Sequence, residues 1–237
     1  MPTKAPISVV IITQNEELNI GRCIRSCRDL GDVIVIDSGS TDKTQEIAEQ
    51  LGAKVIIQPW LGFGPQKRFG IDQIQTDWFL NLDADEYLTP VLFREIQSLS
   101  LDDPTQAFRV NRRSFFLGRE VRFSGWNPDW VTRIGNKTHC NFTKDTVHER
   151  LAGHTIEVSL PGLLMHNSYS SQAEVAEKTQ LYGRLGQLSR RCKKNKWMAA
   201  CWAFFRTYIL RLGLLDGVTG LRIASMNAKT TYIKYSD

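Results

Sequence analysis

Short apolar runs alternate with segments of helical periodicity through the first 88 residues of the chain. Apolar residues at helical spacing predict helices over 18–30, 42–51 and 65–74. Four runs rich in β-branched or aromatic residues predict strands: ISVVII (7–12), DVIVI (32–36), AKVIIQ (53–58) and DWFLNL (77–82). Because these strands are apolar at nearly every position, they are typical of a parallel sheet with helices on both faces. The pattern therefore predicts the α/β class.

The pattern changes after residue 88. A strand predicted at 107–112 (AFRVNR) alternates with aromatic-rich loops, and no further strand–helix–strand unit follows it. The last third has helical periodicity and begins after Ser170 or Ser171, either of which can cap a helix. We therefore predict one α/β domain of two halves and a helical carboxyl-terminal extension: 1–168, divided into 1–88 and 89–168, and 169–237.

Polar residues gather directly after three of the predicted strands, in the segments TQNEE, DSGSTDK and DADE. The carboxyl ends of parallel strands meet at one edge of a sheet, and ligands bind there. Asp83 and Asp85 stand one residue apart at this edge, and neighbouring carboxylates repel each other unless a cation neutralises them. The spacing predicts a divalent metal, Mn²⁺ or Mg²⁺, that carries phosphate oxygens. The alternatives are that both residues cap the helix after Pro90 or lie in solvent.

Two nucleotide-binding motifs are missing from the chain. No GxGxxG follows the first strand and no GxxxxGK[ST] occurs, which argues against a dinucleotide enzyme and a P-loop nucleotidase. The net charge of +5 favours partners that carry phosphate or an anionic surface. Lys67 and Arg68, at the start of the third predicted helix, are candidates for a diphosphate site, or else an exposed pair of cations.

Cysteine usage and the amino terminus both favour a cytoplasmic protein. The five cysteines are odd in number and form no CxxC pair, so we expect reduced, buried thiols. The first apolar run ends in Asn15, Glu16 and Glu17 and not in a small-residue cleavage site, which predicts a strand and not a signal peptide.

Four motifs between residues 7 and 88 resemble glycosyltransferase family 2, whose nucleotide-diphospho-sugar domain has the GT-A fold. They are ISVVIITQNEE, VIVIDSGSTDKT, GFGPQKRFGID and NLDADEYL, in the order of the family. The resemblance implies a Rossmann-like, mostly parallel central sheet and a UDP-sugar donor. It also implies that Asp37 recognises uracil or ribose, that Asp83 meets the nucleotide sugar and that Asp85 holds the metal. The expected nucleotide-sugar site consists of Thr13, Asn15, Glu16, Asp37, Ser40, Lys67, Arg68, Asp83 and Asp85.

The second half of the α/β domain is expected to bind the acceptor. The segment GWNPDWVTRIG (125–135) contains Trp126, Asp129 and Arg133. An aromatic face for stacking together with charged hydrogen-bonding groups is suited to binding a sugar. The alternative places the tryptophans Trp126 and Trp130 in the core.

A sugar hydroxyl is a weak nucleophile, so transfer requires a group that accepts its proton. Glu149, in DTVHERL, is the candidate general base, with Asp129 and Asp145 as rivals. His148 is expected to orient the acceptor or the base, unless it is a structural histidine. His166 is a candidate second metal ligand, because a late histidine completes the metal shell in several GT-A enzymes and an imidazole suits Mn²⁺ better than Mg²⁺; a structural role is the alternative.

The segments GWNPDW, VHE and HNSYSS together resemble the bacterial lipopolysaccharide inner-core β-1,4-glucosyltransferases. This resemblance implies inverting transfer of glucose from UDP-glucose to a heptose of a lipid-A-linked core. Within the same family the alternative is a polyprenyl-phosphate or other glycan-directed transferase. A sugar nucleotidyltransferase is disfavoured because no Gly-rich activation loop opens the chain. A nucleic-acid-binding function is supported only by the basic tail, so we expect no nucleic-acid partner.

A cationic run, RRCKKNK (190–196), precedes the apolar stretch WMAACWAFFRTYILRLGLL. Arg206 and Arg211 interrupt this stretch, which is therefore not a clean span of about 20 apolar residues. Cations beside exposed aromatic residues are typical of contact with an anionic membrane surface. We expect the protein to be peripheral at the inner face of the cytoplasmic membrane; the alternative is a helix packed on the α/β domain.

Overall fold

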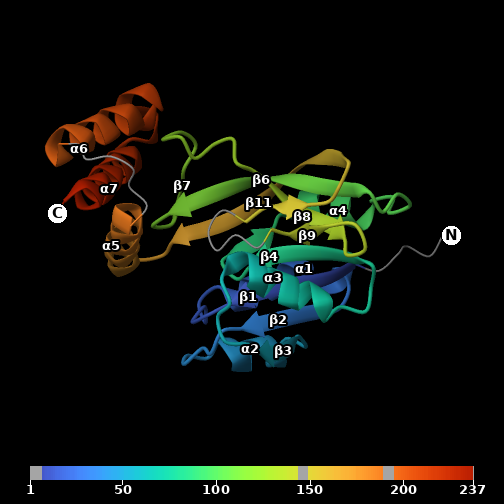
Figure 1. Ribbon diagram of the computed structural model, residues 1–237. Helices are drawn as coiled ribbons and strands as arrows, with labels where there is room; N and C mark the ends of the chain where they lie inside the picture. Colours follow the sequence, from blue (N-terminus) through green and yellow to red (C-terminus); the bar gives the residue numbers. More distant parts are fainter. Residues whose placement is uncertain (1–6, 144–148, 189–194, 237) are drawn as a thin grey trace. The chain divides into compact units, whose positions relative to one another are not determined.

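The computed structural model describes residues 7–143, 149–188 and 195–236 (Figure 1). His148 and Asp145 therefore lie outside the described residues, as does most of the cationic run. The described residues group into two units: unit 1 is Met1–Arg112 with Trp130–His166, and unit 2 is Arg113–Asp129 with Asn167–Asp237. The segment Arg113–Asp129, which belongs to the predicted α/β domain, groups with the helices of unit 2.

Unit 1 contains the predicted α/β elements. Its helices are α1 (Ile20–Cys27), α2 (Thr44–Gln50), α3 (Phe63–Asp72) and α4 (Pro90–Gln97), with a 3₁₀ turn at Arg28–Leu30. Its strands are β1 (Ile7–Thr13), β2 (Val33–Asp37), β3 (Lys54–Ile57), β4 (Trp78–Asp83), β5 (Glu86–Leu88), β8 (Trp130–Asn136), β9 (Asn141–Phe142) and β10 (Leu151–Ala152). Two strands, β6 (Gln106–Phe116) and β11 (Ile156–Tyr169), continue from unit 1 into unit 2.

The main sheet has the strand order β3-β2-β1-β4-β8-β6-β11-β5. The first four strands are parallel, whereas β8 is antiparallel to both β4 and β6, and β5 is antiparallel to β11. The parallel part of the sheet follows from the alternation of strands and helices in the first 88 residues. The α/β class is confirmed, with a mixed sheet whose amino-terminal half is the parallel one.

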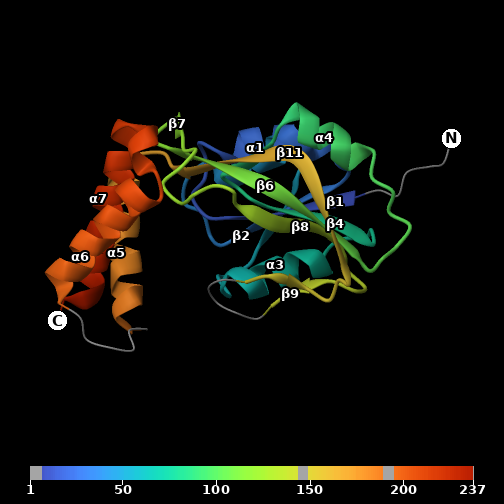
Figure 2. The ribbon, with the colours of Figure 1, turned by 90° about the horizontal axis from the view of Figure 1, so that it is seen from above.

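Alternate residues of the parallel strands face two separate cores. Val9 and Ile11 pack with the residues of α1, α2 and α4, whereas Val10 and Ile12 pack with Ile71 of α3. Figure 2 shows α1 and α4 on one side of the sheet and α3 on the other. Because both faces are covered, the strands are apolar at nearly every position.

Local chemistry explains where the helices begin. Thr89 caps α4, since its hydroxyl accepts a hydrogen bond from the Leu92 N–H at 3.3 Å. The helix after Pro90 therefore has its own cap, and the capping role considered for Asp83 and Asp85 is unnecessary. The helix α2 begins at Thr44, whose N–H donates to the Asp42 side chain at 3.0 Å.

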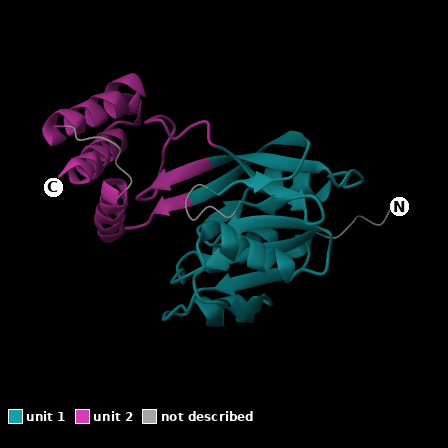
Figure 3. Cartoon of the chain, viewed as in Figure 1, with its two compact units in different colours: residues 1–112, 130–166 teal, residues 113–129, 167–237 magenta. Residues whose placement is uncertain are grey.

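Unit 2 carries the predicted carboxyl-terminal helices (Figure 3). Its elements are β7 (Arg119–Glu120), α5 (Gln172–Leu188), α6 (Lys196–Phe205), a π-helical turn at Arg206–Leu210, a 3₁₀ turn at Gly213–Asp216 and α7 (Val218–Tyr235). The helix α7 packs on both others: Gln187 donates to the Ile233 carbonyl at 2.8 Å, and the rings of Trp197 and Tyr232 lie 4.8 Å apart. None of the helices among the described residues is both long and apolar enough to span a bilayer.

The described cysteines are free thiols. Cys23, Cys27 and Cys140 are buried as expected, but Cys201 is exposed. The expectation of burial is therefore wrong for Cys201, because α6 presents this position to the outside of unit 2. Cys192 lies outside the described residues.

Candidate active site

Three parallel strands end side by side at one edge of the sheet in unit 1. In the register of β1 and β2, Thr13 pairs with Asp37, and in that of β1 and β4, Ile12 pairs with Asp83. The three polar loops thus begin at neighbouring positions. This is the edge at which ligands bind in open α/β sheets.

The first two polar loops are joined by hydrogen bonds. Asn15 adopts a left-handed backbone conformation, with a φ of 55°, and its N–H donates to the Ser40 hydroxyl at 2.8 Å. The Asn15 side-chain oxygen accepts the Thr41 N–H at 2.8 Å, and the Glu16 N–H donates to the Thr44 hydroxyl at 2.7 Å. These contacts form one platform from two segments about 25 residues apart in the chain.

Asp37 organises this platform from within. Its carboxylate is fully buried and accepts hydrogen bonds from the N–H groups of Gly39 and Ser40, from the Ser40 hydroxyl and from the Gln45 amide. Contact between Asp37 and a nucleotide stays a prediction. Thr13 differs, because its buried hydroxyl has no hydrogen-bond partner among the described residues.

The Asp83 carboxylate lies between two cations. Arg133 donates to Oδ2 at 2.7 Å, and the Lys67 ammonium lies 3.2 Å from Oδ1. Desolvation works to raise the pKa of Asp83, but the charges of Arg133 and Lys67 hold it well below its usual range. Asp83 is therefore a carboxylate. Arg133, expected at the acceptor, is buried against the DADE turn, and its acceptor role stays a prediction.

Glu86 and Arg112 complete this ion network, although neither was assigned a role from the sequence. Glu86 is fully buried; it accepts hydrogen bonds from Arg133 and, at 3.2 Å, from Arg112, and its second oxygen accepts the Asp83 N–H at 3.1 Å. The signal was present in NLDADEYL, because three carboxylates within four residues require more than one cation. The network fixes the turn between β4 and β5.

Asp85 lies beside His166. Their Oδ2 and Nε2 atoms are 3.2 Å apart, because β11 runs antiparallel to β5 and places His166 opposite Glu86. Burial works to lower the pKa of His166, but the charge of Asp85 and the hydrogen bond to it together raise the pKa above its usual value.

The Asp85 and His166 pair fits a divalent cation that is held partly by substrate. A cation bound to both side chains would displace the shared proton. The described residues contain no cluster of three or more His, Cys, Asp and Glu side chains suited to a metal. Phosphate oxygens and water would have to supply the other ligands, as is usual for Mg²⁺ sites, while the mixed oxygen and nitrogen set also suits Mn²⁺.

Lys67 connects Asp83 with the candidate base. Its Nζ lies 2.7 Å from Glu149 Oε1, and its side chain is only 2% exposed. Lys67 thus joins Glu149 to Asp83, although 66 residues separate the two carboxylates in the chain. Arg68 donates to the Phe142 carbonyl at 2.8 Å. Both cations expected at a diphosphate therefore have protein partners, and the diphosphate role stays a prediction.

Two of the residues expected at the acceptor belong to unit 2. Trp126 packs in an aromatic cluster, with its ring centroid 6.2 Å from that of Phe116 and 6.1 Å from that of Tyr169. Asp129 is partly exposed at the end of the segment. Their acceptor roles, and the rival role of Asp129 as base, stay predictions.

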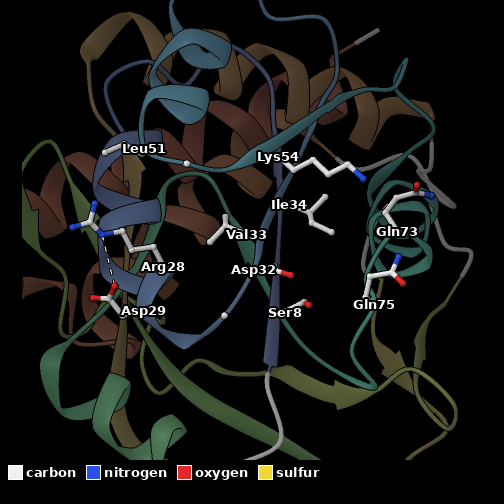
Figure 4. A pocket seen from close by; sticks show the side chains of 12 residues that line it. Ser8, Arg28, Asp29, Asp32, Val33, Ile34, Leu51, Lys54, Gln73 and Gln75 are labelled. Atoms are coloured by element: carbon white, nitrogen blue, oxygen red, sulfur yellow. Dashed lines mark ion pairs between the residues drawn. The ribbon is translucent and has the colours of Figure 1, made fainter.

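A cavity of unit 1 lies at the opposite end of the strands and has a volume of about 420 Å³. Its lining residues include Ser8, Asp32 and Lys54, at the amino ends of β1, β2 and β3 (Figure 4). Ser8 already bonds to Thr76, whose hydroxyl donates to Ser8 Oγ at 2.8 Å. None of the unpartnered buried polar atoms found among the described residues lies in this cavity, so we assign it no role.

Comparison with known proteins agrees with this geometry. A family model described as glycosyl transferase family 2 matches residues 8–156. An uncharacterized glycosyltransferase of Rickettsia bellii is 53% identical over 235 residues, which cover 90% of this chain and 79% of that protein. The lipopolysaccharide core biosynthesis glycosyltransferase LpsC of Rhizobium meliloti is 35% identical over 143 residues, or 57% of this chain and 51% of LpsC. S. aureus TarS shares the fold, with a TM-score of 0.50 and 16% identity over 90% of this chain and 46% of TarS.

Proposed function

Because the chain belongs to glycosyl transferase family 2, we propose that it is an inverting, metal-dependent enzyme that transfers glucose from UDP-glucose to a hydroxyl of the lipopolysaccharide inner core. One observation carries the chemistry: Asp83, Lys67 and Glu149 form a continuous ion chain at the carboxyl edge of the sheet. The acceptor class is supported by the likeness to LpsC, whose name places it in lipopolysaccharide core biosynthesis.

The donor would lie on the platform formed by the first two loops. The Thr13 hydroxyl, which is buried and has no partner among the described residues, and the exposed Asn15 side chain would offer polar groups to the uridine. Asp83, kept ionised by Arg133, would offer acceptors to sugar hydroxyls. Asp85 and His166 would hold the divalent cation, which when bound stabilises negative charge on the departing diphosphate.

Glu149 is assigned as the general base. Its Oε1 is occupied by Lys67, so Oε2 is the oxygen that would accept the proton of the acceptor hydroxyl. As that proton moves, the hydroxyl oxygen forms a bond to the anomeric carbon and the bond from this carbon to the UDP oxygen breaks. A single displacement of this kind inverts the anomeric configuration.

We place the enzyme at the inner face of the cytoplasmic membrane, where a lipid-A-linked acceptor is available. Unit 2 would make this attachment, since its helices combine cations with exposed aromatic side chains such as Trp197 and Trp202. The enzyme would then be peripheral, because charge and apolar contact together hold it at the surface.

The test is UDP release from UDP-glucose, with and without a lipopolysaccharide acceptor truncated at the inner core. We expect release that depends on the acceptor and on Mn²⁺ or Mg²⁺, and a product whose NMR spectrum shows the β anomer. Glu149→Gln serves as the control for contaminating activity. Transfer from GDP- or ADP-sugars but not from UDP-sugars would contradict the proposed donor. Transfer to polyprenyl phosphate but not to the core would contradict the proposed acceptor.

A further inference from the structure

The carboxyl-terminal part of the sequence concentrates the positive charge of the protein. Residues 179–236 contain 11 Lys and Arg and one acidic residue, Asp216, whereas the rest of the chain contains 19 Lys and Arg and 24 Asp and Glu. Asp216 is already engaged: it accepts the Ser124 hydroxyl at 2.7 Å and the Phe123 N–H at 3.1 Å. In the described helices, the charged side chains of α6 and α7 are all cations, namely Lys196, Arg222, Lys229 and Lys234, and Arg206 directly follows α6.

The same helices expose large apolar side chains. Met198 is 73% exposed and Trp202 is 56% exposed, and Phe205 and Leu210 are also exposed. Met198, Trp202 and Phe205 are spaced four and three residues apart and so share one face of α6, and exposed apolar side chains that lie together mark an interaction site. Because only positive charge accompanies it, the partner that fits is both apolar and anionic.

A groove between α6 and α7 gives this surface a defined site. The two helices are antiparallel, since Trp197 contacts Tyr232 and Thr207 accepts a hydrogen bond from Asn227. The groove encloses about 610 Å³, which is within the range of small-molecule sites.

The walls of the groove differ in chemistry. Met198, Ala199 and Trp202 of α6 form an apolar wall, and Arg206 and Lys234 bring cations to the groove. No ion pair joins either cation to an acidic side chain within the residues that the structure describes. An anionic amphiphile needs an apolar surface for its tail and cations for its charged headgroup, and this groove offers both.

We propose that this groove binds an anionic phospholipid. The acyl chain would lie against Met198, Ala199 and Trp202, and the headgroup phosphate would contact the cations that line the groove, Arg206 and Lys234. The inference rests on the membrane attachment proposed above and gives it a specific lipid site. It does not depend on the sugar-transfer reaction.

The first experiment measures sedimentation of the full chain with vesicles of phosphatidylcholine alone or in equimolar mixture with phosphatidylglycerol. Each cation near an anionic surface contributes about fivefold to binding. The variant Arg206→Gln/Lys234→Gln should therefore lose about 30-fold on mixed vesicles. The matched control is Arg222→Gln/Lys229→Gln, which removes the same charge from exposed positions of α7 outside the groove.

The control variant should lose much less than the groove variant. Equal losses of vesicle affinity in both variants would mean that only the overall charge matters, and would overturn the proposal that the groove binds lipid. Failure of the wild type to bind mixed vesicles would overturn the membrane attachment as well. Sugar transfer to a soluble core oligosaccharide is measured separately, so neither outcome touches the proposed reaction.

The second experiment is calorimetry with dihexanoyl phosphatidylglycerol below its micelle concentration. We expect one saturable site per chain, which inorganic phosphate does not fill and which Trp202→Ser weakens about tenfold or more, given the apolar area that Trp202 offers. Circular dichroism checks that the variants are folded. The absence of a saturable site would overturn the proposal. A dimer seen by light scattering that Trp202→Ser dissociates would also overturn it, because a second copy of the chain would then occupy the groove.

Discussion

Lys67 is a buried ammonium group held between two carboxylates. It lies 3.2 Å from Asp83 and 2.7 Å from Glu149, and its side chain is almost without contact with water. A buried charge requires such partners because desolvation is costly. If Glu149 is the base and Asp83 meets the donor, as proposed, Lys67 is the residue that positions the one relative to the other.

We expect Lys67→Met to lower the rate of transfer by about 10²-fold, the usual scale for misplacing a catalytic group, with little change in UDP affinity measured by calorimetry. In a Glu149→Gln background the same substitution should add little, because the positioned group is already gone. Thermal unfolding of each variant controls for loss of structure. A large loss of UDP affinity with an unchanged turnover number would instead assign Lys67 to the diphosphate.

Glu149→Gln should leave donor affinity unchanged and lower transfer by about 10²–10⁴-fold, because the amide cannot accept the proton of the acceptor hydroxyl. Steady-state kinetics with the core acceptor measures this. The parallel variant Asp129→Asn is the comparison, since Asp129 is the rival base among the described residues. Near-normal transfer by Glu149→Gln together with an inactive Asp129→Asn would move the role of base to Asp129.

Asp85→Asn should abolish metal-dependent transfer. Loss of a charged ligand removes several kcal/mol of leaving-group stabilisation, which corresponds to about 10³-fold or more in rate. Mn²⁺ binding, followed by calorimetry in the presence of UDP, should weaken in parallel. Excess EDTA should stop the wild type and added Mn²⁺ should restore it; full activity in EDTA would contradict the metal role.

At the scale of the elements, α3 is the helix that brings Lys67 to the site, and its distance from the sheet is set by a glycine. A Cβ atom added at Gly70 would lie 2.4 Å from Val10 Cγ1 and 3.0 Å from Ile36 Cγ1. No side chain fits between α3 and the strands β1 and β2. The absence of a side chain therefore lets the helix pack directly on the sheet.

Gly70→Ala should lower the free energy of unfolding by about 1–3 kcal/mol, the usual cost of overpacking a core. Its gain in helix propensity, up to about 1 kcal/mol, is smaller. Urea denaturation measures the difference. Asp72→Ala, at an exposed position of the same helix, is the matched control and should change stability by less than about 0.5 kcal/mol. Equal stability of Gly70→Ala and the wild type would show that α3 can move away from the sheet.

At the scale of the whole molecule, charge is separated along the chain. Residues 179–236 are strongly cationic, whereas the remaining residues carry more acids than bases. Exposed charges act over a distance of about 10 Å at an ionic strength of 0.1 M and about 3 Å at 1 M. The separation therefore predicts two different responses to salt.

Raising the ionic strength from about 0.1 M to about 1 M should release the protein from anionic vesicles, because attraction to the surface is screened. Transfer to a soluble core oligosaccharide should change by less than about threefold, since Lys67, Arg133 and Glu86 are buried and the other site charges are half-buried, so salt screens them poorly. Co-sedimentation and UDP release measure the two responses in the same buffers. Vesicle binding that is insensitive to salt would show that apolar contact alone holds the protein.

The sequence by itself determined the four parallel strands and the edge of the sheet where the site lies, but it did not predict β8 or the long strand β11. Short apolar runs rich in β-branched or aromatic residues favour strands with both faces covered, and β1 to β4 were predicted within one or two residues at either end. The three polar loops follow from the same strands, because parallel strands end at one edge. The cationic, interrupted apolar tail also excluded a clean membrane span without knowledge of the fold.

Only the tertiary structure decided which charges meet. Lys67 and Glu149 are 82 residues apart, and Arg133 and Asp83 are 50 apart. Periodicity reports burial along one element, but the pairing of distant side chains depends on strand order and register. For that reason the contacts of Arg133 with Asp83 and Glu86 were not predicted, and Glu86 and Arg112 were not assigned. The groove between α6 and α7 likewise depends on the packing of two antiparallel helices, which the sequence did not reveal.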